Sequence, residues 1–183
     1  MTKSQFIYTT YITTTPQKLW DALINPEFTK QYWFGARSES AWKAGSPWRL
    51  CFPDGQIADA GEIVESIPAK RLVIKWRNEW NPDLKAEGYS RCIFDIEREG
   101  VAVKLTVTHS LDTAPSKLIE AVSDGWPKVL SNLKSLLETG QVVLDKVIDC
   151  RTKDKESSLD RQHRISRVVS LGSGQRRARR GAG

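Results

Sequence analysis

The chain has 183 residues, with 28 lysines and arginines against 22 aspartates and glutamates, which gives a formal net charge of +6. Residues 1–141 hold 17 basic and 17 acidic side chains, whereas residues 142–183 hold 11 and 5. All 16 aromatic residues also lie before residue 141. The sequence therefore predicts one neutral domain with a core over 1–141 and a basic tail over 142–183 that lacks core-forming residues.

Several classes of protein are excluded by what the sequence does not contain. The first residues have no apolar segment typical of a secretory signal, and no apolar run approaches the roughly 20 residues that span a bilayer. The three cysteines (Cys51, Cys92 and Cys150) show no paired spacing, so neither a zinc site nor a disulfide framework is predicted. Motifs of catalytic triads and phosphate-binding loops are absent. We expect a cytoplasmic protein without a metal or cofactor.

The first part of the chain predicts a strand and two short helices. Residues 5–12 alternate as a strand does, with Phe6, Tyr8, Thr10 and Ile12 on one face. Thr15 and Pro16 are typical of a helix start, and the helix should end at Asn25 because the residue before a proline avoids helical geometry. A second short helix is expected from Pro26 to near residue 35.

The middle of the chain predicts strands. We expect them over 48–52, 58–67, 72–77, 89–97 and 101–109, with a polar loop over 78–88 and a hairpin between the last two strands. Simple alternation puts Glu62 and Glu65 on opposite faces of their strand. Together with the first strand, these segments predict an antiparallel sheet of about six strands.

Residues 115–139 form the longest predicted helix, because apolar residues recur at spacings of three and four. Pro127 lies inside this helix and predicts a kink or break near residues 125–126. Gly140 is a typical helix terminator, although residues 142–148 are apolar enough to extend the helix by up to two turns. An antiparallel sheet covered by one long amphipathic helix is an α+β domain.

Five segments carry a resemblance to a known family: TTTPQKLWDALINPEFTKQYWFG, WKAGSPW, GEIVESIPAKRLVIKWR, LTVTHS and DGWPKVLSNLKSLLETG. Together they resemble the bacterial domains that are homologous to the C-terminal domain of the activator of Hsp90 ATPase. These domains belong to the START-like, or Bet v 1-like, superfamily. The resemblance extends over residues 5–141 and leaves out the tail.

This resemblance implies a helix-grip fold, in which a curved antiparallel sheet wraps around a long C-terminal helix with a cavity between them. The superfamily includes lipid carriers, hormone-binding proteins, polyketide cyclases and oxygenase subunits, as well as co-chaperones. The fold alone therefore does not determine the function.

Aromatic residues are the strongest functional signal, because cavities for apolar ligands are lined mainly by such side chains. Trp76 and Trp126 are the best candidates, since both lie on inward-facing stripes. Trp80 lies in the polar loop and is expected at the cavity mouth. The full set of cavity candidates is Trp33, Phe34, Trp48, Trp76, Trp80, Tyr89, Phe94, His109 and Trp126.

His109 shares a strand face with Leu105 and Val107, which directs it toward the long helix. An imidazole beside a cavity can act as an acid, a base or a ligand contact. The alternative is a histidine at a strand end that only hydrogen-bonds the backbone, and we favour this structural role. The sequence places no acid–base partner beside His109, so no catalytic residue is assigned.

Three functions follow as hypotheses. The first is non-catalytic binding of an apolar or lipid-like molecule in the cavity. The second is a co-chaperone or stress-response interaction domain that binds a chaperone of the Hsp90 class. The third is a cyclase- or hydratase-like enzyme that uses His109 as a base. An exposed sheet edge allows a homodimer. The tail has too modest a charge for us to expect a nucleic-acid partner.

Overall fold

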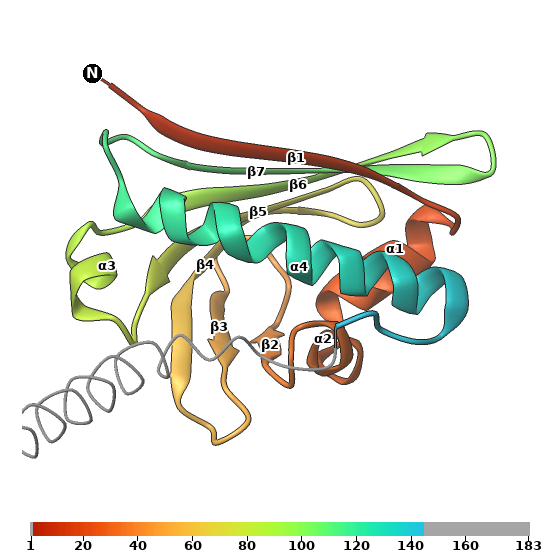
Figure 1. The fold of residues 1–183 in the computed structure, drawn as a ribbon, viewed down its shortest axis with the longest axis horizontal. Helices are drawn as coiled ribbons and strands as arrows, with labels where there is room; N and C mark the ends of the chain where they lie inside the picture. Colours follow the sequence, from red (N-terminus) through yellow and green to blue (C-terminus); the bar gives the residue numbers. More distant parts are fainter. Residues whose placement is uncertain (1, 145–183) are drawn as a thin grey trace, which may run out of the picture. The chain divides into compact units, whose positions relative to one another are not determined.

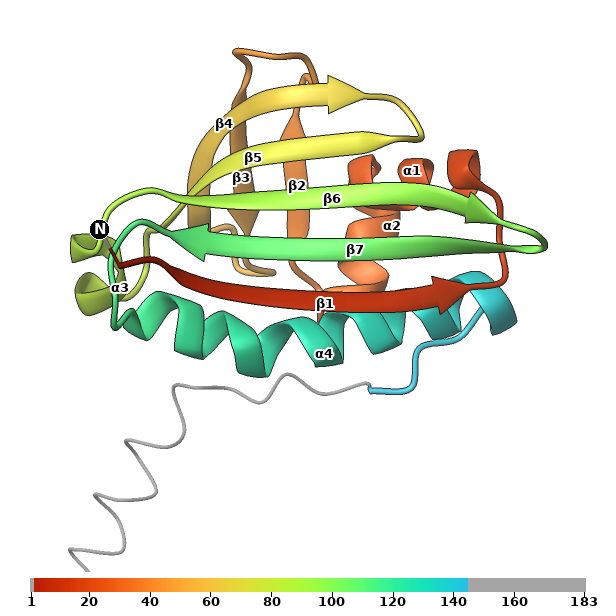
Figure 2. The same ribbon diagram turned by 90° about the horizontal axis from the view of Figure 1, so that it is seen from above.

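The computed structural model describes residues 2–144, which form a seven-stranded antiparallel sheet with the order β1-β7-β6-β5-β4-β3-β2 (Figures 1 and 2). The elements in chain order are β1 Ser4–Ile12, α1 Pro16–Ile24, α2 Pro26–Tyr32, β2 Arg37–Ser40, β3 Pro47–Cys51, β4 Ile57–Ile67, β5 Arg71–Asn78, α3 Pro82–Ala86, β6 Ser90–Glu99, β7 Ala102–Leu111 and α4 Lys117–Thr139. Helix α4 crosses one face of the sheet, here called the inner face (Figure 1). The expected α+β architecture is confirmed.

Alternation along the strands decides which side chains reach the core. In β1, Phe6 and Tyr8 pack against the core, whereas Ile7 is 58% exposed on the outer face. In β7, Val103, Leu105 and Val107 are fully buried between sheet and helix. These faces are the ones that the sequence predicts, because a strand with one buried face must alternate apolar and polar positions.

The sheet is strongly bent in β4. Figure 2 shows β2 and β3 running across the direction of β6, β7 and β1. A bulge shifts the β4–β5 register between Ile63 and Glu65, so that Glu62 lies opposite Lys75 and Glu65 opposite Val73. Both glutamates therefore lie on the outer face. The expectation of opposite faces was wrong, because a bulge inserts one residue and reverses the alternation that follows it.

Gly61 lies in β4, where the backbone of β5 leaves no room for a side chain. It pairs with Trp48 on β3 and with Trp76 on β5. A Cβ atom at this position would lie 1.7 Å from the carbonyl oxygen of Lys75. With no side chain between them, the rings of Trp48 and Trp76 meet above Gly61 with their centroids 4.3 Å apart.

The two short helices begin at the predicted caps. The Thr15 hydroxyl accepts a hydrogen bond from the backbone N–H of Lys18 at 3.2 Å. Asn25 ends α1, and its side chain accepts from the N–H of Glu27 to begin α2. Strand β2 and helix α3 were not predicted. Each is only four or five residues long, and too short for a periodic pattern to stand out.

Of the kink or break predicted near residues 125–126, the break does not occur, because α4 is one helix that continues through Pro127. A proline removes one helical hydrogen bond, but the helix is held on both sides of residue 127 by the burial of Trp126, Val129 and Leu130. Gly140 ends the helix with a left-handed φ of 78°. Residues 141–144 are not helical, so the described part of the expected extension is absent.

The segment after α4 turns back and is held by a buried asparagine. The Asn132 side chain donates to the Leu144 carbonyl and accepts from the Leu144 N–H, both at 2.8 Å. It also donates to the carbonyl of Tyr32, at 3.3 Å. These bonds explain why residues 141–144 do not continue the helix. Most of the predicted tail, residues 145–183, lies outside the described residues. Among residues 2–144, no helix is both long and apolar enough to cross a bilayer.

Candidate functional site: the aromatic interior

The space between α4 and the sheet is occupied by a cluster of tryptophans. The Trp33 ring lies with its centroid 6.1 Å from that of Trp76 and 5.3 Å from that of Trp126. Phe94 meets Trp126 edge-on at 5.6 Å. These separations are typical of favourable aromatic pairs. The cluster therefore brings together side chains from α2, the sheet and α4.

Each ring of this aromatic cluster is positioned by its element. Trp76 and Trp48 come from neighbouring inner positions of the sheet on either side of Gly61. The indole N–H of Trp48 donates to the Ser38 hydroxyl at 2.7 Å, which fixes the ring against β2. Trp126 lies on the buried stripe of α4, and Trp33 is the C-cap residue of α2. The inward placement of Trp76 and Trp126 agrees with the sequence pattern.

The rings leave only a small cavity. Its volume is about 10 Å³, which is near the lower limit for holding one water molecule. Pockets for drug-sized ligands are typically about 300–1,000 Å³. The residues that line this cavity are Leu23, Tyr32, Trp33, Ser38, Trp42, Trp48, Leu72, Ile74, Trp76 and Phe94. Four of the cavity candidates from the sequence are among them.

His109 is fully buried beside the aromatic cluster, and both of its ring nitrogens are used. The indole N–H of Trp126 donates to Nδ1 at 3.2 Å. Because an indole can only donate, Nδ1 must carry no proton. The proton on Nε2 then donates to the Ser90 hydroxyl at 2.8 Å, and Ser90 donates to the carbonyl of Trp76 at 3.0 Å. This chain of bonds selects one tautomer of a neutral imidazole.

Desolvation lowers the pKa of His109 to about 3, because the charged imidazolium would be buried away from water. Within residues 2–144, His109 hydrogen-bonds no carboxylate. The partners that sequence reasoning missed are Ser90 and the indole of Trp126. The arrangement supports a neutral structural histidine, but its polar partners are side chains rather than the backbone groups that we expected.

Asp59 is a second buried ionisable group beside the aromatic cluster, and the sequence analysis did not identify it. Its carboxylate accepts a hydrogen bond from the Asn78 side chain at 3.0 Å and another from the Trp76 side chain. Burial raises its pKa to about 7. The sequence contained one indication of this position. Asp59 is two residues from Gly61, and strand alternation therefore places both on the inner face.

The other candidates lie outside the cavity lining. Trp80 is 38% exposed and meets Phe52 edge-on at 6.1 Å. Phe34 packs on the core with a left-handed φ of 52°. Tyr89 is 45% exposed, and it lies on the outer face because the next residue, Ser90, is buried on the inner face. The cavity position that we expected for Tyr89 is therefore corrected by strand alternation.

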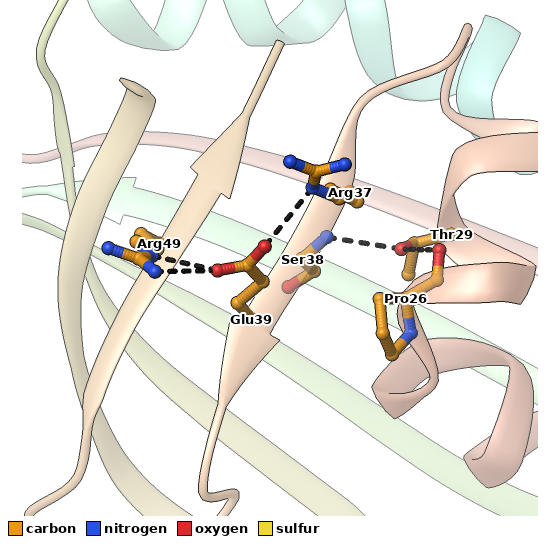
Figure 3. A network of polar contacts seen from close by, with 6 residues as sticks. All are labelled: Pro26, Thr29, Arg37, Ser38, Glu39 and Arg49. Atoms are coloured by element: carbon orange, nitrogen blue, oxygen red, sulfur yellow. Dashed lines mark hydrogen bonds and ion pairs between the residues drawn. The ribbon is translucent and has the colours of Figure 1, made fainter. Parts of the chain in front are cut away.

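An open groove of about 250 Å³ lies along the β2–β3 edge, lined by Glu39, Ser40, Pro47, Trp48 and Arg49. Figure 3 shows Glu39 between Arg37 and Arg49. Nitrogen atoms of these arginines lie 3.1 and 2.8 Å from the Glu39 carboxylate. The groove is thus bordered by a carboxylate whose charge is already paired.

Comparison with known proteins gives a family match over most of the domain. The model of the family described as "Activator of Hsp90 ATPase homolog 1-like protein" matches residues 13–138. No curated protein sequence matches the chain.

Solved structures share the fold at low sequence identity. A protein from Mesorhizobium loti is 19% identical, with a TM-score of 0.63 over 73% of this chain and 96% of that one. The Aha1 dimer from Colwellia psychrerythraea is also 19% identical, with a TM-score of 0.62 over 75% and 98%. An Hsp90 activator from Plasmodium falciparum is 22% identical, with a TM-score of 0.60 over 73% and 95%.

Proposed function

Because this chain belongs to the family of activator of Hsp90 ATPase homolog 1-like proteins, we propose that it is a protein-binding module that acts through its surface on a chaperone of the Hsp90 class. A binding protein stimulates the ATPase of its partner when it binds the active conformation more tightly than the inactive one. This role requires no catalytic residue and no internal ligand in the module itself.

The observation that carries this proposal is the filled interior. The cavity among the tryptophans is about 10 Å³, far below the volume of a drug-sized pocket. An interior of this kind gives the sheet and α4 a rigid core. A function through the outer surface fits such an interior, and an Hsp90 activator is among the proteins that share the fold.

The proposal is tested with the Hsp90-class chaperone of the same organism. We expect the full chain to bind the purified chaperone in isothermal titration calorimetry and to raise its rate of ATP hydrolysis. ATP hydrolysis by the chain alone is the background to be subtracted. A chain that neither binds the chaperone nor changes its ATPase rate would contradict the proposal.

A second candidate function is binding of an apolar or lipid-like molecule, which is supported by the aromatic lining of the small cavity. Such a ligand would require Trp33 and Trp76 to move apart. Native mass spectrometry of the protein purified from its host tests this candidate, because a resident ligand adds mass. An empty protein that also takes up no fluorescent fatty acid would eliminate it.

The cyclase- or hydratase-like alternative receives no support from His109. A general base must offer a free lone pair to the proton that it removes, and Nδ1 of His109 already accepts the indole proton of Trp126. The low pKa of this imidazole also makes it a weak base near neutral pH.

A second copy of this chain is a further proposed partner. Strand β1 lies at one edge of the sheet and has β7 as its only neighbour in the part of the chain that the structure describes. A strand with one unpaired side can pair with the same strand of another molecule. Light scattering of the purified protein over a range of concentrations tests this, with a constant monomer mass as the contrary result.

A further inference from the structure

One region of the outer sheet face collects positive charge around an aromatic ring. It consists of Lys75 and Arg77 on β5, Arg91 at the start of β6 and Tyr89 just before that strand, and is here called the basic–aromatic patch. Lys75 pairs with Arg91 in the β5–β6 register, and Tyr89 is 45% exposed. In the described residues, α4 covers only the opposite face of the sheet (Figure 1). The patch is therefore accessible.

The ring of Tyr89 organises two of the cations. The Lys75 Nζ atom lies 4.4 Å from the ring centroid, and the Arg77 Cζ atom lies 4.7 Å from it. Cation–π contacts of this length hold the long side chains in place. The charge of Arg77 is also paired with Glu79, whose carboxylate lies 2.7 Å from Arg77 Nε, whereas Lys75 keeps its charge unpaired within residues 2–144. The patch thus presents cations at set positions, which reduces the entropy lost when an anionic group binds.

Two other cross-strand pairs on the outer face join opposite charges, unlike the pair in this patch. Arg71 and Asp95 are cross-strand partners and form an ion pair, and Glu97 and Lys104 do so at 3.3 Å.

By contrast, Lys75 and Arg91 are cross-strand partners of like charge, a pairing that destabilises a sheet. Within residues 2–144 neither forms an ion pair, although Glu62 lies opposite Lys75 on β4. Such a like-charge pair lowers stability, and a role in binding would explain why the surface carries it.

We propose that the basic–aromatic patch binds an acidic, extended segment of a partner protein, an inference that rests on the proposed function because it names the surface and chemistry of the partner. Carboxylates of such a segment are attracted by Lys75 and Arg91, while Arg77, paired with Glu79, helps to position the Tyr89 ring. The next row of the face adds half-buried Ile93 and, on β1, exposed Ile7, which an apolar residue of the segment can contact. The patch lies on a sheet face rather than on a protruding apolar loop, which favours a peptide over a membrane surface.

The test compares two double variants of the full chain. Lys75→Gln with Arg91→Gln removes two charges from the patch. Lys18→Gln with Lys43→Gln removes two from exposed positions on α1 and in the loop before β3. The probe is fluorescein-labelled octaglutamate, followed by fluorescence anisotropy at low and at physiological ionic strength. Circular dichroism checks that both variants are folded.

We expect the patch variant to bind octaglutamate about tenfold more weakly than the wild-type chain, a loss of about 1.4 kcal/mol, since it lacks two of the charges that attract the peptide. The control variant should bind as the wild-type chain does, and added salt should weaken all binding. Equal binding by the two variants would overturn the proposal, as would failure of the wild-type chain to bind the peptide.

Two parallel measurements separate this proposal from its alternatives. Vesicles containing phosphatidylserine are tested with the same proteins, and binding to these vesicles without binding to octaglutamate would overturn the proposal in favour of a lipid surface. Chaperone binding is measured as well. A further outcome is that the patch variant binds octaglutamate more weakly than the wild-type chain, while the wild-type chain does not bind the chaperone. That result would support the peptide-binding patch and contradict the proposed chaperone role.

Discussion

The imidazole of His109 lies in an environment that accepts only its neutral form. Trp126 donates to one nitrogen, the other donates to Ser90, and no water-exposed side remains. Asp59 lies in a similar environment, but burial acts on its charge in the opposite sense, since an acid is charged when it loses its proton. These two residues therefore give the stability of the domain two opposite dependences on pH.

The first prediction concerns His109. Its pKa is about 3 in the folded chain and near 6.5 when unfolded, so only the unfolded chain binds this proton between those values. Its contribution to stability is complete above pH 6.5 and is lost as the pH falls toward 3, by about 1.4 kcal/mol per pH unit. His109→Gln should remove this contribution, so that the free energy of unfolding changes more negatively with rising pH between 4 and 6.5 than it does in the wild-type chain. Urea denaturation from pH 4 to 8 measures it, and an unchanged slope would contradict the assignment.

The second prediction concerns Asp59. Its pKa is about 7 in the folded chain and near 3.8 when unfolded, so the folded chain holds the extra proton between those values. Its contribution to stability is complete below pH 3.8 and is lost as the pH rises through 7. We expect Asp59→Asn to abolish this loss. Between pH 3.8 and 7, the free energy of unfolding of the variant should therefore change more positively with rising pH than that of the wild-type chain. The wild-type chain should show a shallow profile near pH 4–6.5, where the two slopes oppose each other.

Among the elements, β4 depends most on a single residue. Gly61 allows β4 and β5 to approach and leaves room for Trp48 above Trp76. The bulge that follows Gly61 turns the Glu65 side chain toward the outer face. There its carboxylate lies 3.3 Å from Arg71 Nε. The bend of the sheet thus combines a glycine with an irregular register, as is usual where sheets curve.

The third prediction compares two glycines. Gly61→Ala should lower the free energy of unfolding by roughly 3 kcal/mol or more, because the new methyl group would overlap the Lys75 carbonyl. Gly125→Ala, in α4, has no atom within 4 Å of the new methyl group and should instead stabilise the chain by about 0.5–1 kcal/mol. Urea denaturation of both variants measures the difference. Equal effects of the two substitutions on the free energy of unfolding would show that β4 and β5 can move apart at Gly61.

Element boundaries were predictable where local chemistry determines them. Thr15, Asn25 and Gly140 each end or begin a helix through their own hydrogen bonds or backbone angle. The continuity of α4 through Pro127 was not predictable in this way, because it depends on the burial of the turns on either side. Strand β2 exists because β3 and Thr29 of α2 hold it, and both contacts are tertiary.

For the molecule as a whole, aromatic side chains from α2, the sheet and α4 pack together and leave a cavity of about 10 Å³ among them. Trp33 is the ring that closes this space from the side of α2, in contact with Trp76 and Trp126. Its removal should convert a packed interior into a cavity of defined shape. The packing can then be tested by adding a small molecule that fills the space of the missing ring.

The fourth prediction uses indole as the missing ring. Trp33→Ala should destabilise the domain by roughly 2–4 kcal/mol and create a cavity that binds indole, which raises the melting temperature of the variant. The wild-type chain and the control Trp80→Ala, which truncates an exposed ring, should show no such rise. Differential scanning fluorimetry with added indole measures this. A rise in the wild-type chain would instead show that its interior opens to admit ligands.

The sequence by itself determined the order of the main elements and the inward faces of β1, β7 and α4, because these follow from composition and local periodicity. Tertiary structure alone decided the volume between the tryptophans, the reversed alternation after Ile63, the tautomer of His109 and the meeting of Lys75, Tyr89 and Arg91. Each of these depends on how side chains from separate elements fit within a few ångströms. A pattern along one element carries no information on that fit.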